Sequence, residues 1–515
     1  MNKTIYDAIN KIRQENIVSF HMPGHKYGRL PRKLEYQEFF SDIYEFDTTE
    51  IYGTDNLHNP KGIIKQSQIN SRKILFPKSD NYDLIYLVNG STCGIESSIF
   101  CSVKKGDKII LNRGCHQSVY NSCLVSDLKP IFVKENISKE GVFIGIEERE
   151  YIEAIENNKD ASVVIITRPT YYGMVFDIEN IIAKAHEYKM RVIVDEAHGS
   201  HFNLHDIFPK SSIYFGADFV IQSLHKTLPC FTQASVLLVN RNRINKSEMG
   251  KLSSSLNIFE SSSPSYLLMS SIEICVEQTE KFGKKLMEDL LNNIYIFKRK
   301  VKNYKIFDTS DPTKIFINTI DKGINGHDFA KLLRYKYNIQ VEMSNYYGIL
   351  MLCSICNIKK DFDLMYDAMN DIVKKNMFIL NSDDNYEYDG FFGYDEKVNY
   401  DNSEDKHGSD DSIKSLKKSK KIELNFPSAI PYRRLSPREA FDATKESIDI
   451  EKSVGKVCGE FIIPYPPGIC IIAPGEIISK EIVDFIVKAR EINMEINGML
   501  SGDFSKIQIV ACNLS

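Results

Sequence analysis

The 515-residue sequence contains no run of about 18 apolar residues, the length that a membrane-spanning helix needs. Its first segment, MNKTIYDAINKIRQENIVSF, lacks an unbroken apolar core of the length found in signal peptides. Lys and Arg total 65 against 69 for Asp and Glu, so the chain also lacks the basic excess of a dedicated nucleic-acid binder. We therefore expect a cytoplasmic protein that binds neither membranes nor nucleic acid.

Cysteine is present, but without the spacing that a disulfide framework or a zinc site requires. The 11 cysteines are scattered and their number is odd. One CxxC pair, Cys353 and Cys356, lies in the apolar run GILMLCSICNI, with no second pair and no clustered histidine. We interpret these residues as free thiols of a reducing compartment, and we expect no metal site.

Short, continuously apolar runs in the middle of the chain are typical of strands that are buried on both faces of a parallel sheet. They fall at residues 83–89, 108–112, 162–167, 191–195 and 218–222. The segment ENIIAKAHEYKM, between two of these runs, places apolar residues at helical spacing. This alternation predicts an α/β fold with right-handed crossovers.

Changes of composition along the chain indicate several units. We predict an N-terminal arm over 1–45, a large domain over 46–285, a small α+β domain over 286–380 and a C-terminal domain over 422–515. The runs KIFINTI and ILMLCSI are the candidate strands of the small domain. Between the last two units, residues 381–421 nearly lack aliphatic residues, and an acidic block precedes a lysine block. We interpret that segment as a disordered insert or linker.

Lys226 lies in the segment QSLHKT directly after the last of the five runs. In open α/β sheets, ligands bind at the carboxyl ends of the strands. Desolvation lowers the pKa of a lysine and frees its amine for Schiff-base chemistry. The flanking Ser223 and His225 could both donate hydrogen bonds to a phosphate. For this segment by itself, a surface lysine after a strand is the alternative.

Asp195 ends the run at 191–195 and begins the segment DEAHG, so its carboxylate should face the same edge of the sheet. A buried carboxylate must be paired. One suitable partner is the pyridinium nitrogen of pyridoxal phosphate (PLP), whose charge makes that cofactor an electron sink. A metal-ligating or helix-capping aspartate is the alternative, but neither explains the lysine.

Two further segments add to this pattern. In VNGSTCG, two glycines bracket hydroxyl side chains where a strand ends and a helix begins, and free N–H groups there can hold a phosphate. An ordinary capped helix is the alternative. In RGCHQS, His116 follows the next strand and could stack on a cofactor ring, although a lone histidine is more often structural. The joint pattern at consecutive strand ends is more specific than any of its members.

These segments, with several more, resemble the PLP-dependent ornithine/lysine/arginine decarboxylases of fold type I in their short bacterial form. The resemblance runs nearly end to end, apart from 381–421. Its further blocks are FHMPGHKYGR, DTTEIYGTDNLHNPKG, TRPTYYG, AIPYRRLSPREAF and GEFIIPYPPGICIIAPGE. It implies an aspartate aminotransferase-like, mostly parallel large domain, a small α+β domain and the family's C-terminal domain.

The resemblance also assigns roles to individual residues. Lys226 would bind PLP covalently as a Schiff base, Asp195 would pair with the pyridine nitrogen, and His116 would stack on the ring. His198 would lie near the ring and its 3′-oxygen. The residues that would surround the phosphate are Ser91, Thr92, Ser223 and His225, with a backbone N–H from Cys93.

The implied activity is decarboxylation of a basic amino acid for polyamine synthesis, with arginine to agmatine favoured and lysine or ornithine as alternatives. The proton donor to Cα stays open among His198, Lys226 and a cysteine. A cationic side chain needs an acidic partner, for which the C-terminal blocks offer Glu476 and Glu460. Either could instead be a structural salt-bridge or helix-start carboxylate. A homodimer or larger homo-oligomer is implied as well.

Two other functions compete with this expectation. An aminotransferase or aldolase of the same fold usually has a substrate-binding arginine in the small domain, and none is identified in this sequence. A non-catalytic homologue would be expected to lose the lysine or the aspartate, whereas this chain keeps both Lys226 and Asp195. Decarboxylation therefore remains the favoured reaction class.

Overall fold

The computed structural model describes residues 4–14, 43–381, 426–427, 429–465, 468–491 and 494–511. Several predicted segments lie outside these residues. They are the block FHMPGHKYGR, nearly all of the insert at 381–421, most of the N-terminal arm, and Pro466 and Pro467 of the PYPPG block. Among the helices of the described residues, none is long and apolar enough to cross a membrane.

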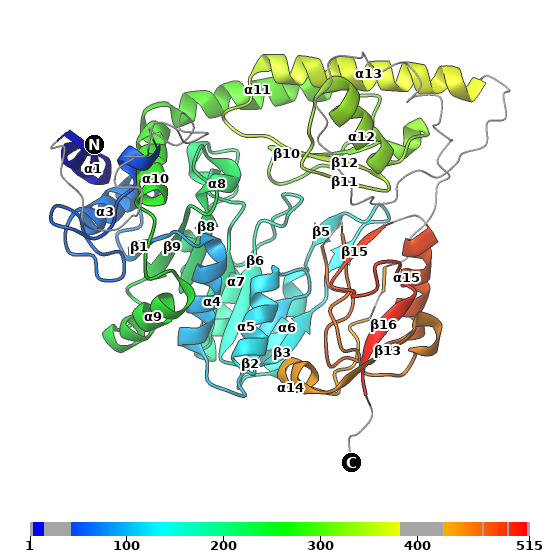
Figure 1. Ribbon diagram of the computed structural model, residues 1–515, viewed down its shortest axis with the longest axis horizontal. Helices are drawn as coiled ribbons and strands as arrows, with labels where there is room; N and C mark the ends of the chain where they lie inside the picture. Colours follow the sequence, from blue (N-terminus) through cyan, green and yellow to red (C-terminus); the bar gives the residue numbers. More distant parts are fainter. Residues whose placement is uncertain are drawn as a thin grey trace, which may run out of the picture.

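A seven-stranded sheet forms the centre of the large domain, in the spatial order β1-β9-β8-β7-β6-β2-β3 (Figure 1). The strand β9 is antiparallel to both of its neighbours, and the other pairs are parallel. The predicted α/β class with a mostly parallel sheet is therefore confirmed. The strands are β1 (Tyr82–Leu87), β2 (Lys108–Asn112), β3 (Lys129–Val133), β6 (Val163–Thr167), β7 (Arg191–Asp195), β8 (Phe219–Ser223) and β9 (Ser235–Asn240).

Helices cover both faces of the sheet, which is why its central strands are apolar throughout. Alternate residues of a strand point to opposite faces. In β6, accordingly, Val163 and Ile165 pack in one core while Val164 and Ile166 pack in the other. The first core contains residues of α4 (Gly90–Ser102), α5 (Gln117–Val125) and α9 (Lys246–Phe259). The second contains residues of α6 (Glu148–Asn157), α7 (Glu179–Glu187) and α10 (Tyr266–Gln278).

The small domain lies beyond the carboxyl ends of these strands, beside the short helix α8 (Leu224–Thr227) in the upper part of Figure 1. Its sheet has the order β10-β12-β11 and is antiparallel. The strands are β10 (Lys314–Asn318), β11 (Met343–Asn345) and β12 (Gly348–Leu352), so the two predicted runs are strands. Three helices accompany them: α11 (Lys284–Lys300), α12 (Gly326–Tyr337) and α13 (Lys359–Asn381). All five residues of β10 are buried.

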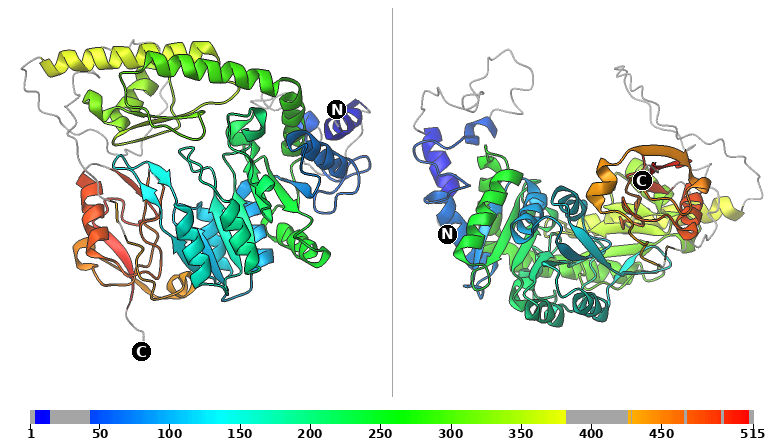
Figure 2. Two further views of the ribbon diagram at one scale, coloured as in Figure 1. Left: turned by 180° about the vertical axis from the view of Figure 1, so that it is seen from behind. Right: turned by 90° about the horizontal axis from the view of Figure 1, so that it is seen from below.

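The C-terminal part has its own hydrophobic core and packs beside the large domain (Figure 2). It contains two antiparallel strand pairs, β13 with β16 and β14 with β15. Its elements are α14 (Pro437–Asp442), β13 (Lys445–Asp449), β14 (Ile463–Tyr465), α15 (Lys480–Glu491), β15 (Glu495–Asn497) and β16 (Lys506–Val510). At the other end of the chain, α1 (Thr4–Gln14) packs against α3 (Ile63–Leu75) and α10.

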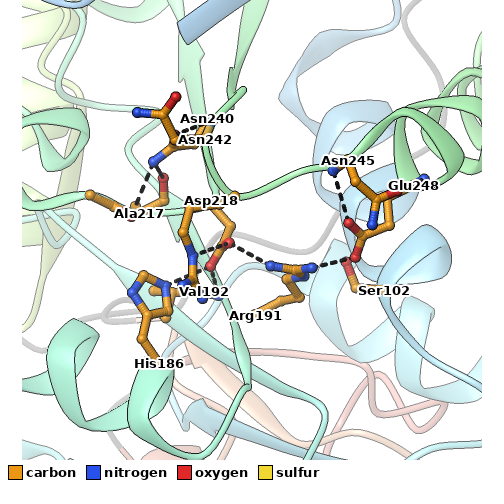
Figure 3. A network of polar contacts seen from close by, with 12 residues as sticks. Ser102, His186, Arg191, Val192, Ala217, Asp218, Asn240, Asn242, Asn245 and Glu248 are labelled. Carbon is orange, nitrogen blue, oxygen red and sulfur yellow. Dashed lines mark hydrogen bonds and ion pairs between the residues drawn. The ribbon is translucent and has the colours of Figure 1, made fainter. Parts of the chain in front are cut away.

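An ionic network fixes the amino ends of the central strands, opposite the predicted site (Figure 3). Asp218 is completely buried and accepts hydrogen bonds from Arg191 at 3.0 Å and from the backbone N–H of Val192 at 2.8 Å. The ring Nε2 of His186 lies 2.8 Å from its Oδ2. Burial by itself would raise the pKa of Asp218, but these bonds and charges outweigh it and hold the pKa below its usual value.

We predict that Asp218→Ala lowers the thermal midpoint of unfolding, because the buried N–H of Val192 loses its acceptor and Arg191 keeps only its bond to Glu248. A buried donor left unsatisfied costs about 1–3 kcal/mol. The matched control is Asp160→Ala, which removes the exposed partner of Lys108 and should leave the midpoint almost unchanged. Equal shifts in the two variants, measured by calorimetry, would contradict this account of the network.

Candidate active site

The carboxyl ends of the neighbouring strands β7 and β8 bring three of the predicted residues together. Asp195 is the last residue of β7, and His198 lies in the turn that follows. Lys226 lies in α8, which begins directly after β8. The Nζ atom of Lys226 is 3.3 Å from Nε2 of His198. Asp195 is buried, and its Oδ1 accepts the N–H of Ala197 at 3.1 Å.

Burial shifts both basic groups of this pair toward their uncharged forms. It lowers the pKa of Lys226, although Asp195 and Glu342 partly oppose the shift. It also lowers the pKa of His198 well below its ordinary value, and the neighbouring Lys314 and Lys226 lower it further. His198 is therefore neutral at pH 7, and the amine of Lys226 is easier to deprotonate than a surface lysine.

His116 lies at the N-cap of α5, in the loop that follows β2. Its Nδ1 accepts the backbone N–H of Ser118 at 3.2 Å, which orients the ring. Burial lowers the pKa of His116, while Asp195 raises it and Lys226 lowers it. These electrostatic effects show that His116 lies near both residues at the same end of the sheet.

The predicted phosphate-binding site lies at the segment that connects β1 to α4. The hydroxyls of Ser91 and Ser223 are 2.6 Å apart, so the first turn of α4 lies against the carboxyl end of β8. The side chain of the N-cap residue Asn89 makes no capping bond, and the N–H of Gly90 donates to the carbonyl of Gln233 at 3.0 Å. The next N–H groups of the first turn of α4 are the ones that an anion could accept. Thr92 is half-buried in that first turn, whereas the Cys93 thiol is buried and donates to the carbonyl of Gly90 at 3.1 Å.

One ring nitrogen of His225 is hydrogen-bonded within the protein and is therefore not available to a phosphate. Its Nδ1 donates to the carbonyl oxygen of Ala234 at 3.1 Å, so Nδ1 carries a proton. Burial lowers the pKa of His225, although the bond to Ala234 opposes this shift. A hydrogen bond from Nε2 to a phosphate therefore requires the ring to be protonated, which the anion itself would favour.

The sequence analysis did not identify three residues near His198. They are Lys314 and Glu342 of the small domain and Tyr171 of the TRPTYYG segment. Lys314, the first residue of β10, is fully buried, and its Nζ lies 3.4 Å from Nδ1 of His198. The ring edge of Tyr171 packs against His198, with 5.0 Å between ring centroids, and its hydroxyl bonds to Glu342. A lysine at the head of the apolar run KIFINTI was the one signal in the sequence for this group.

Glu476 is placed in a buried ion pair. Arg113 donates to its two carboxylate oxygens at 2.7 and 2.6 Å, and Arg433 and the N–H of Ala473 donate at 3.0 and 2.8 Å. Glu460 accepts two backbone N–H groups, from residues 500 and 508. Both carboxylates are thus engaged within the chain, and Glu476 is engaged in an ion pair, as the salt-bridge alternative expects. Their contact with a substrate stays a prediction that these bonds do not support.

The comparisons with known proteins identify the family of the chain. Residues 4–315 match the family described as Orn/Lys/Arg decarboxylase, major domain, and residues 420–501 match its C-terminal domain. The chain belongs to the Orn/Lys/Arg decarboxylase family. It is therefore an amino-acid decarboxylase, a carbon–carbon lyase.

Relatives span almost the whole of this decarboxylase. An arginine decarboxylase of Bacillus anthracis is 30% identical over 509 residues, which cover 96% of this chain and 94% of that one. The inducible lysine decarboxylase of Escherichia coli K12 is 22% identical, over 95% and 78% of the two chains. A lysine decarboxylase of Francisella novicida has a TM-score of 0.80 at 19% identity, over 99% and 81% of the chains. That likeness confirms the fold type I architecture.

For this decarboxylase we predict that Glu476→Ala is destabilising rather than a substrate-binding defect. It leaves Arg113 and Arg433 without a carboxylate in a buried site, at a cost of about 3–5 kcal/mol. The thermal midpoint should fall, whereas KM in the variant that remains folded should change little. Glu439→Ala, in the exposed capping box of α14, is the control with a small shift. A higher KM with an unchanged midpoint would instead support the substrate role.

Proposed function

We propose that the protein decarboxylates L-arginine to agmatine and carbon dioxide, with PLP bound at Lys226. The partly buried amine of Lys226 beside His198, at the strand end next to Asp195, is the observation that most supports this function. Arginine is favoured because arginine decarboxylases are 30% and 29% identical to the chain, against 22% for the lysine enzyme. Lysine and ornithine remain the alternatives.

The residues present fit the three parts of PLP. Its aldehyde requires an amine of lowered pKa, which Lys226 offers. Its pyridine nitrogen requires a buried carboxylate, and no described residue donates to Oδ2 of Asp195. Its phosphate requires N–H and hydroxyl donors, which the first turn of α4 offers with Ser91 and Ser223. The donor set thus matches the chemistry of the three parts of PLP.

When bound, PLP withdraws electrons from the bond between Cα and the carboxylate, which lets carbon dioxide leave. Asp195 would hold a proton on the pyridine nitrogen by its negative charge, and His116 would pack against the ring. Cα then needs a proton. Lys226 and the neutral His198 are the two groups placed to hold one, since their nitrogens are 3.3 Å apart.

We also infer a cytoplasmic homodimer or larger homo-oligomer, and a place for the product in polyamine synthesis. Support for the assembly comes from the family resemblance and from exposed aromatic side chains. Phe231, five residues after Lys226, is 58% exposed, and Tyr432 is 77% exposed. A second copy of the chain would remove such apolar surface from water.

Carbon dioxide release should be fastest with L-arginine when arginine, lysine and ornithine are compared at equal concentration. A guanidinium can form two hydrogen bonds with one carboxylate, and we expect a preference in kcat/KM of about tenfold or more. The measurement is manometric or coupled carbon dioxide release with the purified protein. Faster release from lysine or ornithine would overturn the substrate but not the reaction class.

Lys226→Ala should abolish turnover and the visible absorbance of covalently bound PLP, because the amine that would bind the cofactor is lost. Lys246→Ala is the matched control, since Lys246 is an exposed lysine at the start of α9. It should keep both signals. Retention of absorbance and turnover in the purified Lys226 variant would exclude the assigned role.

A further inference from the structure

Lys314 is a lysine with no exposed surface. Lysine is almost never fully buried unless it is paired, because its ammonium is strongly hydrated in water. Two groups lie close to its Nζ: Nδ1 of His198 at 3.4 Å and Oδ2 of Asp311 at 3.8 Å. Asp311 supplies the opposite charge, and the shorter contact of Nζ, within hydrogen-bond distance, is with His198.

The hydrogen bonds that described residues make to the Asp311 carboxylate involve only its Oδ1, so Oδ2 is the oxygen that faces Lys314. Its Oδ1 accepts the N–H and the hydroxyl of Thr313 at 3.0 and 2.6 Å, and Nε2 of His201 lies 3.2 Å away. Its buried Oδ2 has no hydrogen-bond partner among the described residues. The carboxylate therefore supplies negative charge beside Lys314 without drawing its N–H away from His198.

His198 lies between two amines, one at each ring nitrogen. Nδ1 faces Lys314 at 3.4 Å, and Nε2 faces Lys226 at 3.3 Å. A neutral imidazole has one N–H donor and one acceptor nitrogen. Burial lowers the pKa of Lys314, and the charges of Asp311 and Glu342 oppose that shift. In its ammonium form, beside the carboxylate of Asp311, Lys314 can only donate, so the nitrogen that faces it must be the acceptor. The proton then belongs on Nε2, which faces the nitrogen of Lys226.

We propose that Lys314 is a positioning residue that fixes His198 in the tautomer with its proton on Nε2. Lys314 would act on the reaction through the imidazole that it contacts. The value of this tautomer rests on the proposed function, in which a proton must be delivered to Cα next to Lys226. With the proton on Nδ1, His198 would present a lone pair there and could not act as the donor.

The backbone beside Lys314 is adapted to its position. Gly173, in the TRPTYYG segment, has a φ of 83°, and a Cβ on it would lie 2.8 Å from Cγ of Lys314. The same Cβ would lie 3.1 Å from Cβ of Asp311, whose N–H donates to the carbonyl of Gly173 at 3.0 Å. Any side chain at residue 173 would displace the stem of Lys314. Glycine thus lets the small domain bring this amine to His198.

The test is the protonation of His198 in the purified holoenzyme, read by magic-angle-spinning NMR of protein labelled with ¹⁵N-histidine. Signals of His198 are those missing from His198→Asn. In the wild type we expect a protonated Nε2 and an unprotonated Nδ1. In Lys314→Met, which keeps the length of the stem without a donor, we expect a mixture of tautomers or a proton on Nδ1.

Kinetics provide the second readout. Lys314→Met should lower kcat by about 10²–10³-fold, in the range found for loss of an acid–base group or its correct tautomer. KM should change by less than about threefold, because the interaction is not made with the bound substrate. Lys298→Met is the matched control. Lys298 is a half-buried lysine that interacts electrostatically with Asp308 and Asp311, and it should change neither readout.

Each outcome bears on the proposal directly. An unchanged tautomer in Lys314→Met that still binds PLP would overturn it. If that variant does not fold, the wild-type spectrum is sufficient, since a proton on Nδ1 or on both nitrogens overturns the proposal. A protein with the expected tautomer but no decarboxylation of arginine, lysine or ornithine would refute the proposed function and leave the tautomer assignment standing.

Discussion

Coverage of the central sheet by helices on both faces is the constraint on which the rest of the molecule depends. Strands such as β8 have every residue buried, so charged side chains can be placed only at their ends. At the amino ends, Asp218 is paired with cations on several sides. At the carboxyl ends, Lys226 is beside a neutral imidazole instead of a hydrogen-bonded carboxylate. One end therefore stabilises the fold, while the other keeps an amine available for reaction.

At the carboxyl ends of the strands, the two lysines each lie near a carboxylate. Lys314 has Asp311 beside it, and Lys226 is influenced by Asp195. Glu342 acts on both lysines as well. Burial is the main reason why the pKa of His198 is lowered so far, and the neighbouring Lys314 and Lys226 lower it further.

Those parts of the structure that depend on residues close together in the sequence could be predicted from it. Continuous apolar runs predicted strands such as β7 and β8, and the residues that follow them were expected at one edge because parallel strands share their carboxyl ends. Features made by distant segments were not accessible in this way. Lys314 and His198 are 116 residues apart, and Arg113 and Glu476 are 363 apart. The acidic residue in the C-terminal block was found, but the arginines that occupy it were not.

The small domain and the C-terminal part are the two outer units, and each contacts the large domain through a buried charged side chain. The small domain extends Lys314 to His198, and the C-terminal part extends Glu476 to Arg113. Arg113 is three residues before His116, and its carbonyl accepts the hydroxyl of Tyr120 at 2.6 Å, so the pair holds the loop that carries His116. Because an unpaired buried charge is costly, the C-terminal part cannot move away from Arg113 without that cost, whereas separation of the small domain would break the contact between Lys314 and the neutral His198. The geometry around Lys226 is thereby tied to the packing of all three units.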